Sequence, residues 1–155
     1  MKNALILTGC ILFTLLVWGI SGYLTIQGVA TWYTTLHKPF FNPPNTIFGP
    51  VWTFLYFLMG VSFFLVIKQP SSPARTRAIQ IFILQLVANF LWSILFFNRH
   101  LIGIALADIL IMLVLIYTMV VTFGRVSRLA SLLQLPYLVW VSFATILNAA
   151  ILYLN

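Results

Sequence analysis

Polar and aromatic side chains recur at helical spacing inside otherwise apolar stretches of this sequence. Three sets each share one helix face, because their members lie three or four residues apart: Trp52, Tyr56 and Met59; Gln85, Asn89 and Trp92; and Trp140, Ala144 and Asn148. Indole and phenol rings offer stacking surfaces, and amides offer hydrogen bonds that orient a ligand. Taken one at a time, the amides are better explained by hydrogen bonds between helices.

Asp108 is the only acidic residue of the chain, and it lies within an apolar stretch. A carboxyl group is costly there, so it indicates either a protonated hydrogen-bond donor or a capped structural group. A proton relay would need a second ionisable partner, and the apolar stretches offer none. His37 and His100 lie in polar intervals and are better explained as solvated loop residues than as metal ligands. We therefore expect no metal site and no required cofactor.

The composition indicates the class of protein. Of the 155 residues, 63% are hydrophobic and 6% are charged, and the mean hydropathy is +1.10. Soluble domains average about 25% charged residues, so this chain is expected to be an integral membrane protein in contact with lipid. Its net charge of +7 comes from basic residues scattered over several loops. These residues form no patch, so nucleic acid is not an expected partner.

Five apolar stretches are each close to the ~20 residues that cross a bilayer as a helix. They cover roughly Ala4–Gly28, Ile47–Ile67, Ala78–Phe97, Leu101–Phe123 and Leu129–Leu154. Their apolar residues are continuous rather than alternating, which argues against a transmembrane barrel. The first stretch is longer than the apolar core of a signal peptide, so we expect it to be retained. The predicted fold is all-α, with a single five-helix transmembrane domain over residues 1–155.

The interval from Trp32 to Trp52 departs from this pattern, yet it remains strongly aromatic. Pro39, Pro43 and Pro44 prevent a continuous helix, because each lacks a backbone N–H donor and restricts the residue before it. An aromatic belt at the membrane surface would explain a single tryptophan. The whole interval is better explained as a structured aromatic loop between the first two helices, packed over the protein as a lid.

The distribution of basic residues predicts the orientation. Five crossings place the amino terminus on the same side as the second and fourth loops, and that side carries Lys2, Lys68, Arg75, Arg77, Arg125 and Arg128. The opposite side carries only Lys38 and Arg99. Basic loops stay in the cytoplasm. We therefore expect a cytoplasmic amino terminus, with the lid and the carboxyl terminus outside. The expected membrane is that of a bacterial cell; in an organellar membrane the two sides would be named differently.

Several motifs follow one another along the chain. They are Trp32-Tyr33-x-x-Leu36-x-Lys38-Pro39, Pro43-Pro44, Phe48-Gly49-Pro50-Val51-Trp52, Gln85-Leu86-x-x-Asn89-x-x-Trp92, Phe96-Phe97, Ala105-Leu106-x-Asp108, Pro136-Tyr137-x-x-Trp140 and Phe143-Ala144-Thr145-x-Leu147-Asn148. This series resembles the TspO/MBR family of tryptophan-rich sensory proteins, which includes the translocator proteins or peripheral-type benzodiazepine receptors. The resemblance covers all but the first span. It implies a five-helix bundle, commonly a homodimer, with a pocket closed by the loop after the first helix.

The resemblance also implies ligands and site residues. Family members bind porphyrins such as protoporphyrin IX and haem, benzodiazepine-site ligands and, in some members, cholesterol. Trp52 and Trp140 match tryptophans implicated in light-dependent porphyrin breakdown, so they are the catalytic candidates if that reaction occurs. The expected ligand-binding residues are Trp32, Tyr33, Trp52, Asn89, Trp92, Asp108, Trp140 and Ala144. The cholesterol motif is incomplete, because Tyr153 is followed only by Leu154 and Asn155.

Three functional classes therefore remain open. We favour a membrane receptor, sensor or transport-linked protein for porphyrins and other amphipathic molecules. The alternatives are an enzyme that degrades protoporphyrin in light and a small proton-coupled exporter. The pocket is expected on the lid side, with Trp52 at lid depth, Trp140 in the deeper wall, and Ala144 leaving room for a bulky ligand. Lys38 and Arg99 are the basic residues available there for the ligand's propionates.

Overall fold

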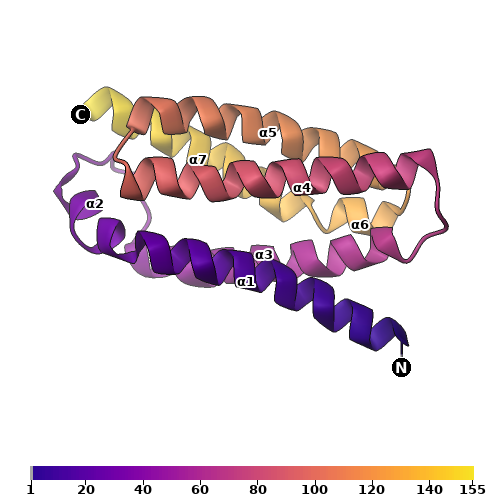
Figure 1. The fold of residues 1–155 in the computed structure, drawn as a ribbon. Helices are drawn as coiled ribbons and strands as arrows, with labels where there is room; N and C mark the ends of the chain where they lie inside the picture. The colour runs from indigo at the N-terminus through magenta and orange to yellow at the C-terminus, as the bar shows by residue number, and fades with distance from the viewer. Residues whose placement is uncertain (1) are drawn as a thin grey trace.

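The computed structural model describes residues 2–155 and confirms an all-α bundle of five helices long and apolar enough to span a membrane (Figure 1). The long helices are α1 (Lys2–Ala30), α3 (Asn45–Ile67), α4 (Pro73–Ser93), α5 (Ile102–Gly124) and α7 (Leu135–Leu154). Two short helices, α2 (Trp32–Thr35) and α6 (Arg128–Leu132), lie between them, and α4 continues into a π-helical turn, η1 (Ile94–Asn98). The chain is an integral membrane protein.

Two of the predicted helix boundaries are wrong for identifiable reasons. α4 begins at Pro73, inside the interval predicted to be a loop, rather than at Ala78. The Ser72 hydroxyl caps this helix by accepting a hydrogen bond from the Arg75 N–H at 3.2 Å, and proline suits a first helical turn. The fifth predicted span is two helices, α6 and α7. Pro136 accounts for the break, because it lacks an N–H and its ring crowds the carbonyl one turn earlier.

The two ends of the bundle differ in their connections. The segment Trp32–Pro44, called the lid below, lies at the same end as the carboxyl terminus, whereas the amino terminus and the α3–α4 link lie at the opposite end (Figure 1). The half of the bundle next to the lid is called the lid half, and the other is called the far half. The lid was predicted as a loop; the structure adds the helical turn α2 within it.

The far half has a closely packed core. The rings of Phe63 and Phe82 stack with centroids 4.3 Å apart, and Phe82 packs in turn on Phe123. The side chains of Met112 and Met119 on α5 are fully buried in the same hydrophobic core. Packing of this kind gives the spanning helices fixed positions, on which the side chains of the lid half depend.

Candidate ligand-binding site

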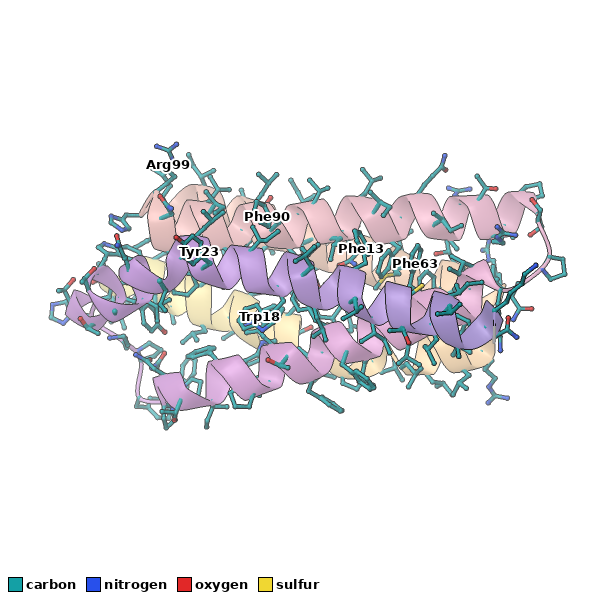
Figure 2. The ribbon with its side chains drawn as sticks, turned by 60° about the horizontal axis from the view of Figure 1, so that its bottom comes forward. Phe13, Trp18, Tyr23, Phe63, Phe90 and Arg99 are labelled. Carbon is teal, nitrogen blue, oxygen red and sulfur yellow. The ribbon has the colours of Figure 1, made fainter. Side chains whose placement is uncertain are left out.

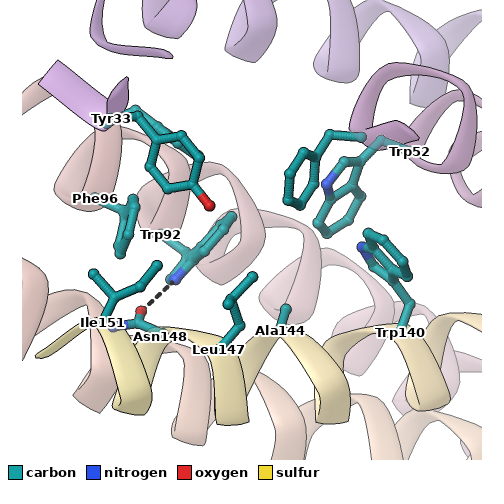
Figure 3. Close-up of a pocket in the computed structure, with 11 residues that line it drawn as sticks. Tyr33, Trp52, Trp92, Phe96, Trp140, Ala144, Leu147, Asn148 and Ile151 are labelled. Atoms are coloured by element: carbon teal, nitrogen blue, oxygen red, sulfur yellow. Dashed lines mark hydrogen bonds between the residues drawn. The ribbon is translucent and has the colours of Figure 1, made fainter. Parts of the chain in front are cut away.

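An aromatic cavity lies under the lid, between α3, α4, η1 and α7 (Figure 3). Its lining consists of Tyr33, Phe48, Trp52, Trp92, Phe96, Phe97, Trp140, Ala144, Leu147, Asn148 and Ile151. The space enclosed is about 20 Å³, which holds about one water molecule. The rings themselves fill the site, so a larger ligand requires them to move.

Trp52 is the centre of the aromatic cluster. Its ring lies 6.0 to 6.5 Å, centroid to centroid, from those of Trp18, Tyr56, Trp92, Tyr137 and Trp140. The rings of Trp52 and Trp140 are perpendicular, an edge-to-face arrangement that is favourable for aromatic pairs. The indole Nε1–H of Trp140 has no hydrogen-bond partner among the described residues. It is a free donor in the wall of the cavity.

Asn148 holds Trp92 in position. The indole Nε1–H of Trp92 donates to Asn148 Oδ1 at 3.1 Å (Figure 3), and Asn148 Nδ2 donates to the Ile102 carbonyl at 3.2 Å. Asn148 thereby connects α4, α5 and α7 in the lining of the cavity. Sequence spacing placed Asn148 on the face of Trp140 and Ala144 and explained its amide by hydrogen bonds between helices, which these two contacts bear out.

A second, larger cavity of about 360 Å³ lies beside the first, on the side of α1. The two cavities share five aromatic residues: Tyr33, Phe48, Trp52, Trp92 and Phe97. The wall between them is thus one layer of rings, called the ring wall below. Displacement of part of that wall would join the two spaces.

A buried hydrogen-bond network lies below Trp52. The Tyr56 hydroxyl donates to Asn89 Oδ1 at 2.9 Å, Asn89 Nδ2 donates to the Tyr137 hydroxyl at 2.6 Å, and that hydroxyl donates to Gln85 Oε1 at 3.0 Å. The network joins α3, α4 and α7. Buried polar groups that are fully paired fix the arrangement of the helices that carry them, so this network gives Trp52 a rigid base.

The lid is fastened to itself and to the end of α7. The Tyr33 hydroxyl donates to Asn42 Oδ1 at 2.7 Å, and burial raises the pKa of this phenol to about 12, so it stays a neutral donor at physiological pH. The His37 N–H donates to Asn155 Oδ1 at 3.0 Å, and Asn155 Nδ2 donates back to the His37 carbonyl at 2.9 Å. These contacts tie the lid to itself and to the end of α7.

His100 supports the start of the lid. Its ring stacks on Trp32 with centroids 4.2 Å apart and planes 13° from parallel. Its backbone has a φ of 58°, a left-handed conformation that usually falls to glycine after a helix. Gly28 packs against the same region, where a Cβ would lie 1.8 Å from the Phe97 carbonyl oxygen. The lid therefore rests on a closely packed junction of α1 and η1.

The expected ligand-binding residues fall into three groups. Those that line the aromatic cavity are Tyr33, Trp52, Trp92, Trp140 and Ala144. Asn89 belongs to the network below it, and Trp32 packs on Phe96 and His100 at the lid. Asp108 lies on α5 outside the lining of both cavities, and its Oδ2 has no hydrogen-bond partner among the described residues.

Other residues near the site were not named as ligand-binding residues from the sequence. Phe96 and Phe97 belong to the motifs of the family resemblance and follow Trp92 by about one helical turn, but no role was assigned to them. Trp18, which stacks on Trp52, also had an unused signal, because Thr14 and Ser21 lie four residues before it and three residues after it on one face of α1. Within residues 2–155, no three His, Cys, Asp or Glu side chains are grouped to hold a metal ion.

Comparison with known proteins identifies the family. A model of the TspO/MBR family matches residues 10–154. The chain is 42% identical to the tryptophan-rich protein TspO of Archaeoglobus fulgidus over 154 residues, 99% of each chain. It is also 35% identical to the tryptophan-rich sensory protein of Cereibacter sphaeroides, over 80% of this chain and 77% of that one. It is 36% identical to the human translocator protein, over 76% of this chain and 70% of that one. Together with the five-helix bundle and the tryptophan cluster under the lid, these matches show that the chain belongs to the TspO/MBR family, which supports a membrane sensor or receptor role.

Proposed function

We propose that this protein is a membrane receptor that binds a porphyrin, or another flat amphipathic molecule, in the aromatic cavity under the lid. The observation that carries the proposal is the ring wall, whose indole and phenol groups expose flat apolar faces to two adjoining spaces. Aromatic residues supply stacking area with little loss of side-chain entropy. The free Nε1–H of Trp140 offers a donor to a ligand acceptor.

Binding requires the ring wall to move. Ligand pockets enclose about 300–1,000 Å³, whereas the aromatic cavity encloses about 20 Å³. The neighbouring cavity of about 360 Å³ falls within that range. We infer that a tetrapyrrole displaces the rings of the wall toward the neighbouring space and binds in the aromatic cavity that this movement enlarges. Its propionates would then point toward the lid, where Lys38 and Arg99 are the available cations.

Tryptophan quenching by protoporphyrin IX in nanodiscs tests the proposal. Trp52→Phe and Trp140→Phe should each weaken binding a few-fold, since one stacked aromatic pair contributes about 0.5–1.5 kcal/mol. Tyr117→Phe is the control, because Tyr117 is 62% exposed on α5. Unchanged affinity in both tryptophan variants would place the site elsewhere. If the parent degraded protoporphyrin in light and either tryptophan substitution abolished this activity, the enzyme that degrades protoporphyrin would be favoured instead.

Ala144 gives a second, steric test. A larger side chain at this position enters a cavity with room for about one water molecule, so it should reduce binding. Ala144→Val is preferable to Ala144→Phe, because a full ring is expected to overpack the site. Ile146→Val is the control on the same helix, since Ile146 is exposed. Melting temperatures would show whether the fold is retained.

We also propose a homodimer in a bacterial cell membrane, with a cytoplasmic amino terminus. α1 is the least buried of the spanning helices and leaves a face for a second copy. The prevalence of basic residues at the far end of the bundle supports the orientation. Labelling of the Ser71→Cys variant only from outside the cell would contradict the orientation. A monomer in native-like bilayers would contradict the homodimer.

A further inference from the structure

The interface between α1 and α3, called the seam below, opens toward the lid. Figure 2 shows the two helices diverging from the level of Trp18. The larger cavity lies in this gap, with Trp18, Gly22 and Ile26 contributed by α1 and Asn45, Gly49 and Trp52 by α3. We propose that this cavity is a lateral entrance, through which a flat apolar ligand passes between the bilayer and the aromatic cavity. The inference rests on the proposed function.

The rim of the cavity faces outward. Ile26 on α1 is 63% exposed, and Asn45 and Gly49 on α3 are exposed as well. Because the flanks of a membrane bundle face lipid, an opening between these residues leads to the hydrocarbon and not to water. A ligand dissolved in the bilayer can therefore reach the ring wall without passing the lid.

Two glycines keep the rim open. A Cβ at Gly22 or at Gly49 would meet no atom within 4 Å, so neither glycine serves a close helix contact. Glycine is also a poor helix former, so its position inside α1 and α3 is not explained by local preference. Their common property is the empty space above them, which any longer side chain would occupy.

Trp18 closes the seam below the entrance. Its indole Nε1–H donates to Thr53 Oγ1 at 3.1 Å, which links α1 to α3. Its ring stacks on Trp52 at 6.3 Å and on Tyr56 at 5.9 Å. An incoming disc-shaped molecule would thus slide over Trp18 and meet the face of Trp52 in the ring wall.

The chemistry of the entrance fits an apolar ligand with one polar edge. Most of its lining is aromatic or aliphatic, whereas Asn45, the first residue of α3, stands at the lid end. The amide is costly within hydrocarbon but is well placed near the membrane surface. A ligand with its polar edge toward Asn45 and its apolar body along Trp18 would enter already oriented.

Association kinetics of protoporphyrin IX with the protein in nanodiscs test the entrance. The variants Gly22→Leu and Gly22→Phe narrow it in steps, and Gly9→Leu and Gly9→Phe are matched controls. Gly9 lies on the same helix with no atom within 4 Å of its Cβ position, but it lines neither of the two cavities described above. We expect association and dissociation to slow together, by up to about tenfold with Phe, within the range usual for variants of one site. Kd should stay nearly constant, because an entrance alters rates and not the equilibrium.

Two outcomes of that experiment would overturn the entrance. One is parent-like rates in both Gly22 variants. The other is a weakened Kd with unchanged association, which would make the cavity part of the binding site itself. Equal slowing of association and dissociation in the Gly9 variants would also contradict the proposal, because the effect would then not come from this opening.

A second readout does not depend on porphyrin. Phospholipids brominated in their acyl chains quench the fluorescence of tryptophans that they contact. The Gly22→Phe and Gly9→Phe variants are compared in a Trp18→Phe background, which removes the indole at the edge of the opening. Gly22→Phe should reduce quenching, whereas Gly9→Phe should not. If the parent bound no porphyrin, the proposed function would be wrong, but the quenching measurement would still show whether lipid reaches the cavity through this opening. Equal quenching in both variants would overturn it.

Discussion

Glycines lie at both ends of the α1–α3 seam, but their surroundings differ. Toward the far half, a Cβ on Gly60 would lie 2.6 Å from Ile11 Cα, so the two backbones are in contact. In the lid half, Gly22 and Gly49 face empty space. The comparison shows that glycines of one helix pair can either permit close packing or border an open cavity. Variants at each end of the seam test this difference.

The largest effect is expected from Gly60→Ala. The added methyl group would collide with the backbone of α1 near Ile11 and Cys10, which cannot move without opening the seam. Overpacking of this kind costs about 1–3 kcal/mol, and a backbone collision belongs at the upper end. Thermal unfolding in detergent would measure the loss. A melting temperature equal to that of the parent would mean that α1 is free to shift.

Two buried glutamines give a smaller but opposite pair of effects. Gln85 and Gln134 are both fully buried, but Gln85 accepts a hydrogen bond from Tyr137 whereas neither amide atom of Gln134 has a partner among the described residues. Gln85→Met should destabilise the protein by about 1–2 kcal/mol, and Gln134→Met should be neutral or stabilising. Denaturation of the two variants side by side measures this. Equal losses would contradict the difference in pairing.

Thr14→Val should have a modest effect on the closed end of the seam. The Thr14 hydroxyl donates to the Tyr56 carbonyl of α3 at 2.8 Å, and such interhelical bonds are worth about 0.6 kcal/mol on average. Thr122→Val is the control, because the Thr122 hydroxyl bonds only within its own helix. If both valine variants lost the same stability, the bond between α1 and α3 would contribute nothing of its own.

The smallest effect is expected from Gly22→Ala at the open end. The methyl group meets no atom within 4 Å, and alanine is favoured over glycine inside a helix by up to about 1 kcal/mol. The melting temperature should therefore stay the same or rise slightly, and porphyrin binding should change little. A loss of stability like that of Gly60→Ala would show that this end of the seam is also closed.

Much of the fold is predictable from the sequence, because the relevant signals are local. The lengths of the apolar stretches predict five spans, and prolines predict the interruption between Trp32 and Trp52. The family motifs led to Trp52, Trp92, Trp140 and Ala144, which line one cavity. The break before Pro136 and the start of α4 at Pro73 also had local signals. Hydropathy missed both, because the break lies within an apolar stretch and the first turn of α4 is polar.

The sequence by itself therefore determined the class of protein, the number of spans and the aromatic character of the lid. Only the tertiary structure decided which glycines are packed, which amides are paired, and that Trp18 joins the cluster around Trp52. The physical reason lies in the solvent. In a bilayer, the helix faces that contact lipid are as apolar as those that contact other helices. Hydropathy consequently reveals that a helix spans the membrane but not which of its faces meets another helix.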